Sequence, residues 1–540
     1  MPSLKFMASW WQGTIFALTF SLLGWAILPY PGIQNDEVLF ATPYFHAVGS
    51  SIFQFGIFHR RVPVMFLTYL GALKNWLCAP IFWLAPPTSW AVRVPPLLLG
   101  ALTILLFVRL LETVHGRRAA RIGGLLLATD TMFLLTTCFD WGPVALQHFL
   151  LLAGGLLLVK FVEQPRRRTL YWGFFCFGLA IWDKALFVWI LGGLALGAIL
   201  IFPRELWKRV TARNVRWAAA GFCLGALPLI VYNSASGFAT FRSNSSFAFD
   251  ELARKAQVLR ASWNGSALLG YIASNPDQQA LPQPAHSLVE RLSFALHGGL
   301  GDHPFNQLTP AFCAALLLLP FLWRTRARKV LLFSLVAMAA AWFQMAIAKG
   351  AGGSAHHAVL LWPIPHLFMA VAFAEASLQW RTAGRWAIAV VVIYLAAQNL
   401  LLTNQYLYQL VRYGSPHSWT DAIYPLSDEL GRMRAPQIVI EDWGILNPLV
   451  LLQKGTLPMI IVDDAFLSPG LSGALRNYHR GLLESALWVG HTPAYQEMAG
   501  TNRKILEAAS SAGFRKELIE TISDREGRAA FEIFGFRKTN

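Results

Sequence analysis

Charged residues are scarce in this sequence: 14% of its 540 residues are Asp, Glu, Lys or Arg, whereas 55% are hydrophobic. No soluble domain of this size needs so much apolar surface, so the composition predicts an integral membrane protein. The 5 cysteines are scattered and show neither metal-binding nor disulfide spacing. A net charge of +16 would suggest nucleic acid in a soluble protein. Here the arginine clusters lie between apolar segments, so the charge reflects membrane topology.

About eleven apolar segments are long enough to be predicted as membrane-spanning helices. They are Trp11–Pro29, Arg93–Leu111, Ala119–Thr137, Pro143–Phe161, Thr169–Asp183, Leu186–Phe202, Trp217–Val231, Pro310–Trp323, Val330–Ala348, His357–Phe373 and Trp386–Thr403. A further stretch, Val64–Leu84, is ambiguous because it contains Lys74, Asn75 and Pro80. It is either a span or an interfacial helix.

The positive-inside rule decides between these alternatives. If Val64–Leu84 is not a span, every basic cluster falls on the side of Lys5. We therefore predict a cytoplasmic N-terminus, an external C-terminus and an external loop, Asn35–Leu84, carrying two interfacial helices. The run after Lys5 has no small-residue cleavage site, which predicts an uncleaved first helix.

The chain divides into two predicted domains. Residues 1–405 form a transmembrane domain with two large external loops, residues 31–92 and residues 233–309, and residues 418–540 form an external soluble α/β domain. Its predicted strands are Gln437–Glu441, Met459–Val462, Ala486–Val489, Arg515–Thr521 and Ala529–Phe536, and its predicted helices are Ala474–Glu484 and Ala494–Ser511. The domain has no glycine-rich nucleotide fingerprint, which favours binding or structure over chemistry there.

Asp36 and Glu37 directly follow the first predicted span. Adjacent carboxylates at a membrane exit are costly to bring near hydrocarbon, so they are functional candidates. Burial and mutual repulsion raise the proton affinity of such a pair, so one of them is suited to act as a general base. The alternative is a solvated loop pair, or N-caps of a helix from Val38 onward.

On the predicted topology, further polar residues share the external side with this pair. They are Arg60, Arg61, Asp140, Asp183, Lys184, Lys349, His356 and His357. For the basic residues, one interpretation is phosphate binding. The alternative for Arg60 and Arg61 is lipid headgroup binding. The alternative for His356 and His357 is that they begin a span. Asp140 either caps the helix after Pro143 or contacts an acceptor or metal. Asp183 and Lys184 are favoured as a structural pair.

Several stretches together resemble the GT-C glycosyltransferases, in particular the bacterial branch related to protein O-mannosyltransferases and lipid A aminoarabinose transferases. These stretches span Trp11 to Thr403 and include Asp36-Glu37, Arg60-Arg61-Val62-Pro63 as the start of an interfacial helix, Ala91–Pro95, Gly116–Ala120, Ala128–Asp140, Gly178–Lys184 and the His356-His357 turn. The chain departs from the family pattern at Val62-Pro63-Val64 and at His356-His357.

This resemblance implies a polytopic α-helical enzyme that moves a sugar from a polyprenyl-phosphate donor to a lipid, glycan or protein acceptor. The transfer takes place outside the bacterial cytoplasmic membrane, in cell-envelope glycan or lipopolysaccharide biosynthesis. Asp36 matches the family's base, with Glu37 beside it, which implies an inverting single displacement.

The remaining site residues supply charge for that reaction. Arg60, Arg61, Lys349, His356 and His357 would bind the donor phosphate, and Asp140 and Lys184 would contact the acceptor or support the site. The sequence identifies no certain cofactor. A divalent metal held by Asp302, His303 and the histidine pair is the less favoured alternative.

Two functions of other classes fit the composition. A transporter or flippase of lipid-linked sugars would show inverted repeats and charges near mid-membrane, and neither is visible. A non-catalytic membrane scaffold would leave Asp36, Arg60 and Arg61 without a role.

Overall fold

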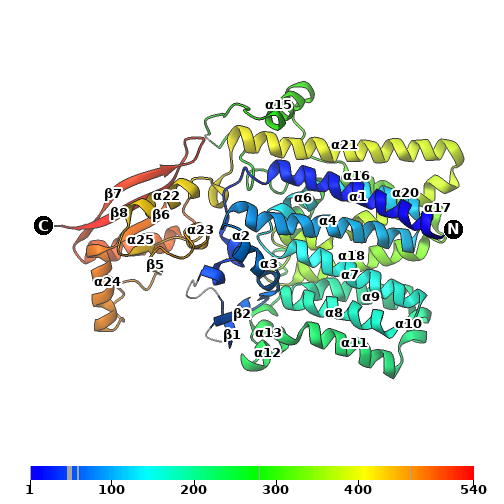
Figure 1. The fold of residues 1–540 in the computed structure, drawn as a ribbon, viewed down its shortest axis with the longest axis horizontal. Helices are drawn as coiled ribbons and strands as arrows, with labels where there is room; N and C mark the ends of the chain where they lie inside the picture. The colour runs from blue at the N-terminus through cyan, green and yellow to red at the C-terminus, as the bar shows by residue number, and fades with distance from the viewer. Residues whose placement is uncertain (1, 46–50, 58–59, 279, 463, 540) are drawn as a thin grey trace.

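The computed structural model describes residues 2–45, 51–57, 60–278, 280–462 and 464–539. A long helical bundle is followed by a smaller mixed domain beyond one of its ends, and the N-terminus lies at the other end (Figure 1). We call these the Asp36 end and the N-terminal end of the bundle. The expected fold class, a polytopic α-helical membrane protein with a small C-terminal α/β domain, is confirmed.

Each predicted span falls on one helix or on two or three consecutive helices. The bundle helices are α1 (Pro2–Ile27), α4 (Ser89–Val114), α5 (Arg117–Ala128), α6 (Thr131–Cys138), α7 (Val144–Glu163), α8 (Arg167–Asp183), α9 (Phe187–Ile201), α10 (Pro203–Arg209), α11 (Ala212–Gly225), α12 (Leu227–Ala235), α16 (Leu308–Leu317), α17 (Leu319–Leu322), α18 (Arg328–Ile347), α19 (Ala355–Ala358), η2 (Val359–Leu361), α20 (Ile364–Gln379) and α21 (Arg381–Tyr413).

Among the described residues, 4 helices are individually long and apolar enough to cross a membrane, or up to 8 if each bent pair is counted as one span. One bend, of 57°, separates α5 from α6, where the sequence predicted a single straight segment. Asp130 lies in this break, and its carboxylate accepts the Phe133 N–H at 2.6 Å as an N-cap of α6. A capping residue within an apolar run therefore interrupts the span.

The first loop contains a small sheet that was not predicted from the sequence. After α2 (Asn35–Val38) and η1 (Thr42–Phe45), strands β1 (Phe53–Ile57), β2 (Arg60–Leu67) and β3 (Leu70–Gly71) form an antiparallel sheet, and α3 (Leu73–Leu84) follows. The prediction that an interfacial helix begins at Arg60–Pro63 is therefore wrong, and the predicted stretch Val64–Leu84 is part strand, part helix. Pro63 is tolerated because it lies beside a bulge in the β1–β2 pairing.

The second large loop also carries short helices, α13 (Ala239–Asn244), α14 (Leu252–Asn264) and α15 (Leu288–Leu300). Lys255 anchors α14, because its buried ammonium group donates to the carbonyls of Ala346 and Ala348 at 3.0 and 2.7 Å. The end of α18 is thereby fixed near the histidine turn.

The C-terminal domain is a three-layer α/β/α unit. Its elements are η3 (His417–Trp419), α22 (Ile423–Met433), β4 (Ile438–Ile440), α23 (Leu446–Leu452), β5 (Met459–Ile461), α24 (Gly473–Ser485), β6 (Leu487–His491), α25 (Ala499–Ser511), β7 (Phe514–Ser523) and β8 (Ala529–Lys538). The strand order is β5-β4-β6-β8-β7, with the first three strands parallel. All five predicted strands are present. Helix α25 begins five residues later than predicted, where Asp442 accepts the N–H groups of Glu497 and Met498.

The two domains meet beside Asp36. Leu451 of α23 packs into one apolar cluster with Ile33 and Val38, which flank the acidic pair. Gly32 donates its N–H to the Trp419 carbonyl at 2.7 Å, and a Cβ on Gly32 would lie 2.0 Å from the Thr420 oxygen. Only glycine allows this close approach.

Candidate active site

The two adjacent carboxylates have different environments. Glu37 is fully buried and receives two hydrogen bonds from the Arg93 guanidinium, at 2.7 and 3.0 Å. The rest of that guanidinium donates to the carbonyls of Leu28, Pro31 and Gly32. Glu37 therefore fixes the loop through Arg93.

Asp36 has no ion pair among the described residues. Its one hydrogen bond to another side chain comes from the Asn35 amide at 3.2 Å, and Gln34 caps α2 by accepting the Asp36 N–H at 2.7 Å. Burial raises the pKa of Asp36 above its ordinary value, and Asn35 and the Lys184 charge oppose that rise. A half-buried carboxylate with raised proton affinity is suited to accept a proton.

Lys184 is a buried cation whose charge lowers the pKa of Asp36. It is 2% exposed, and no hydrogen bond or ion pair involves its ammonium group within the described part of the chain. Burial lowers the pKa of Lys184 to about 8, against the attraction of nearby carboxylates. Gly142 leaves room for this ammonium, since a Cβ there would lie 3.1 Å from Lys184 Nζ and 3.5 Å from the His356 ring.

Asp140 is held by a second buried ion pair. Lys74 of α3 contacts its carboxylate and its carbonyl, each at 2.8 Å. The other carboxylate oxygen accepts the Val144 and Ala145 N–H groups, so Asp140 caps α7, one of the two roles left open by the sequence. Asp183 accepts a hydrogen bond from Gln147 at 2.8 Å and has no ion pair with Lys184.

Aromatic rings form one wall beside these charges. Trp141 packs against His356, Tyr271 and Trp419 with ring centroids 5.3, 6.0 and 5.7 Å apart. Burial raises the pKa of Tyr271, and the Asp36 charge raises it further, so the phenol lies within electrostatic reach of the carboxylate. Residues from both domains thus surround Asp36.

The structure does not bring all of the expected cations together. Arg61 is exposed on β2 and Lys349 is exposed in the turn after α18, and neither makes a side-chain contact with Asp36 in the described chain. The side chain of Arg60 lies outside the described residues. His356 and His357 lie in α19 with rings 4.3 Å apart, and the Ser354 hydroxyl contacts His356 Nδ1 at 3.1 Å.

The expected metal alternative also has no assembled site. Asp302 accepts a hydrogen bond from Gln405 at 3.0 Å, and His303 bonds to the same glutamine through its backbone. Within the described ranges, the one cluster of carboxylates with spacing suited to a metal ion consists of Asp421, Asp524 and Glu526, in the C-terminal domain. Arg525 and Arg528 pair with these acids, so their charge is largely compensated.

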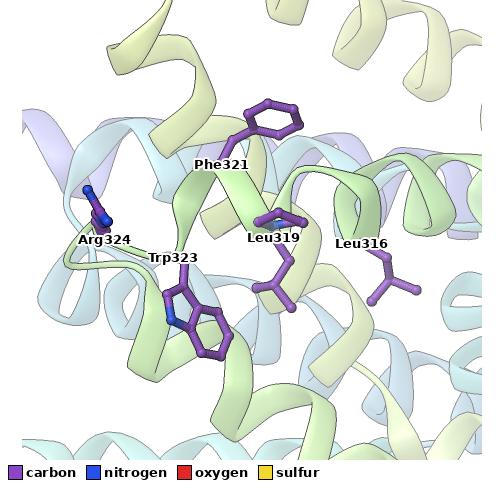
Figure 2. Close-up of a pocket in the computed structure, with 6 residues that line it drawn as sticks. Leu316, Leu319, Phe321, Trp323 and Arg324 are labelled. Carbon is purple, nitrogen blue, oxygen red and sulfur yellow. The ribbon is translucent and has the colours of Figure 1, made fainter.

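A pocket of about 560 Å³ lies elsewhere, around α16 and α17. Its lining includes Leu316, Leu319, Trp323 and Arg324, and Figure 2 shows Leu319 and Trp323 on the side of α17 opposite Phe321. Helices α16 and α17 lie far in the fold from Asp36, toward the N-terminal end (Figure 1). The pocket contains no acid–base group.

Four polar residues around Asp36 were not predicted as site residues from the sequence: Lys74, Arg93, Gln147 and Tyr271. Lys74 and Arg93 had a detectable signal, because a cation within an apolar run requires a buried partner. Gln147 and Tyr271 had none, since neither residue type is unusual at its position.

Comparisons with known proteins agree with this fold. Residues 71–232 match the family described as dolichyl-phosphate-mannose-protein mannosyltransferase. The structure is similar to ArnT from Cupriavidus metallidurans bound to undecaprenyl phosphate, with 13% sequence identity, a TM-score of 0.56 and coverage of 96% of this chain and 97% of that one. It also resembles the Archaeoglobus fulgidus oligosaccharyltransferase, with 12% identity, a TM-score of 0.50 and coverage of 99% and 74%. A search of curated proteins gives no match.

Proposed function

From the premise that this chain has the fold of the GT-C membrane glycosyltransferases, we propose that it transfers a sugar from a polyprenyl-phosphate carrier to a hydroxyl-bearing acceptor. The observation that supports this most directly is the division of roles between Asp36 and Glu37. One carboxylate is paired with Arg93, and the other has no ion pair among the described residues and is influenced by the charge of the buried Lys184.

The proposed reaction is a single displacement. Asp36 accepts the proton of the acceptor hydroxyl as that oxygen attacks the anomeric carbon. The bond between this carbon and the phosphate oxygen breaks, and the lipid phosphate leaves with the bonding electron pair. The configuration at the anomeric carbon is inverted, because Asp36 acts as a base and not as a nucleophile.

Lys184 provides the positive charge of the proposed site, and the His356–His357 pair lies beside it. A fixed cation stabilises the negative charge that develops on the leaving phosphate. Lys184 is well suited because it is buried beside Gly142, where there is no intervening side chain. Arg61 and Lys349, both exposed, would act farther out, on the entering donor or the lipid headgroups.

The membrane arrangement belongs to the same proposal. The Asp36 end of the bundle and the C-terminal domain face the outside of the bacterial cytoplasmic membrane, and the basic loops of the N-terminal end face the cytoplasm. The proposed donor carrier is undecaprenyl phosphate, the molecule bound in the similar ArnT structure, or a related polyprenyl phosphate. Cell-envelope lipids or glycans are the proposed acceptors.

The test is donor consumption by membranes that contain the protein. Undecaprenyl-phosphate sugars with labelled headgroups are incubated with wild-type and Asp36→Asn membranes. Consumption by the wild type, and its loss in Asp36→Asn, is the expected result. If the wild type binds a donor and moves it across the membrane without consuming it, the protein is a transporter and the proposal is wrong.

A further inference from the structure

Tyr271 lies on a loop, residues 265–278, that both domains hold in place; we call it the Tyr271 loop. At its base, the buried Tyr406 hydroxyl of α21 donates to the Gly265 carbonyl at 2.7 Å and accepts the Leu268 N–H at 3.1 Å. The bundle thus fixes the beginning of the loop. The part that follows Tyr271 is fixed by the C-terminal domain.

Arg528 makes this second attachment. The residue is buried in the turn between β7 and β8, and its guanidinium donates to Asp524 and to the Ser274 hydroxyl, each at 2.6 Å. It also donates to the Ser415 carbonyl at 3.2 Å. One side chain therefore joins the turn, the Tyr271 loop and the segment after α21, and we call these contacts the Arg528 latch.

Backbone contacts support the latch. Ser274 donates its N–H to the Gly414 carbonyl at 3.0 Å, and Leu281 donates to the Glu526 carbonyl at 2.9 Å. Gly414 has φ +66°, and a Cβ there would lie 2.2 Å from a Glu526 carboxylate oxygen. The turn and the segment after α21 are in contact at a position where only glycine fits.

Tyr271 precedes Ser274 by three residues and packs against Trp141, whose ring also contacts His356. Its ring packs against Trp141 and Trp419, and it remains 39% exposed, so its hydroxyl is accessible. A phenol combines a hydrogen-bonding group with an aromatic face, a combination that suits a sugar or another hydroxyl-bearing molecule.

We infer that Tyr271 contacts the acceptor beside Asp36 and that the Arg528 latch positions it there, which gives the C-terminal domain a role in acceptor positioning. This inference rests on the proposed function. Arg528 is a positioning residue, since it acts through Ser274 and the loop, and it has no contact with the donor side of the site at Lys184 and His356.

The test combines a structural and a kinetic measurement on the full-length protein. Hydrogen–deuterium exchange of the Tyr271 loop and donor consumption in membranes are compared for wild type, Arg528→Gln and Ser274→Ala. Arg537→Gln is the matched control, because Arg537 lies on β8 in an exposed ion pair with Glu517. We expect faster loop exchange and turnover lower by about 10–100-fold in Arg528→Gln, with the donor KM unchanged.

Three comparisons separate positioning from a general loss of structure. Arg528→Lys should recover part of the turnover, since it keeps the charge but loses the forked geometry. In a Tyr271→Ala background, Arg528→Gln should lower turnover little further. Ser274→Ala leaves the contacts within the C-terminal domain intact, and it should also speed exchange of the Tyr271 loop and lower turnover. It therefore tests the latch if Arg528→Gln does not fold.

Unchanged loop exchange in both Arg528→Gln and Ser274→Ala would overturn the latch. Faster exchange with wild-type turnover would overturn the role of Tyr271 in acceptor positioning. If wild-type membranes consume no donor, the proposed function fails, and the role in acceptor positioning fails with it.

Discussion

The two ends of the bundle hold their charges in different ways. At the Asp36 end, the side chains of the Arg93–Glu37 pair are 0% and 1% exposed, and those of Lys74–Asp140 are 6% and 2% exposed. At the N-terminal end, Lys329 and Glu205 form a pair with side chains 54% and 44% exposed. Arg326, whose side chain is 67% exposed, contacts Glu375, which also pairs with the buried His115. Buried pairs impose one geometry on their surroundings, because separating them leaves an uncompensated charge in a low dielectric. Exposed pairs are screened and contribute little.

The buried pairs of the Asp36 end are typical of a functional site, whereas the exposed basic residues of the N-terminal end are typical of a signal for membrane orientation. The exposed basic residues of the N-terminal end are sufficient to orient a membrane protein. Burying the charges of the Asp36 end costs desolvation free energy, and orienting the protein in the membrane does not require that burial. Asp36, Asp183 and Lys184 have no ion pair among the described residues of that site.

The largest expected effect is on Asp36. Asp36→Asn keeps the shape of the side chain but cannot accept a proton, so turnover should fall by roughly 10²–10⁴-fold. Donor affinity, measured separately by binding of the labelled donor in detergent, should change little. Wild-type turnover in Asp36→Asn would show that the unpaired carboxylate is not the base.

The second effect is on stability at the same end. Arg93→Met leaves Glu37 buried without a partner and should destabilise the protein by about 3–5 kcal/mol. The measurement is the thermal unfolding midpoint in detergent. The double variant Arg93→Met/Glu37→Gln should regain part of the loss, and equal midpoints for the single and double variants would contradict the buried-pair interpretation.

The third effect concerns Lys184 and pH. Lys184→Met should lower turnover by about 10²–10³-fold if Lys184 stabilises the leaving phosphate. The Lys184 charge lowers the pKa of Asp36, so its removal should raise that pKa and move the acid limb of kcat/KM to higher pH. The pH–rate profile is the measurement. Arg61→Ala is the comparison, and a larger loss there would assign the phosphate role to the first loop.

The smallest effect is expected at the N-terminal end. Lys329→Ala removes an exposed pair with Glu205 and should change stability by about 0–1 kcal/mol. The thermal midpoint, compared with that of Arg93→Met, is the measurement. A loss as large as that of Arg93→Met would remove the distinction between the two ends.

Hydropathy was sufficient to place the apolar segments on helices, and the basic clusters were sufficient to exclude Val64–Leu84 as a span, because both signals are carried by residues close together in the sequence. The β1–β3 sheet was missed for a different reason. Val62, Pro63 and Val64 were assigned to a helix by family resemblance, although two β-branched residues beside a proline favour a strand. The pairing with β1 that stabilises this strand depends on residues outside the motif.

Asp36 and Glu37 were identified as a pair, but not their different roles. That difference depends on Arg93, 56 residues beyond Glu37, and the sequence provides no measure of which carboxylate it reaches. Tyr271 illustrates the same limit more strongly. Its loop is held by a hydrogen bond between Ser274 and Arg528, which are 254 residues apart.

The Arg93–Glu37 pair also has a consequence for biogenesis. A ribosome delivers α1 and the acidic loop to the membrane before α4, so Glu37 must wait for its partner. Arg93 lies near the first turn of α4, at the Asp36 end, so it reaches Glu37 only when this end of α4 is in place. A charged side chain inserted alone is costly, and pairing with Glu37 offsets part of that cost once α4 is in position. The pair thus links correct insertion of α4 to the shape of the loop that carries Asp36.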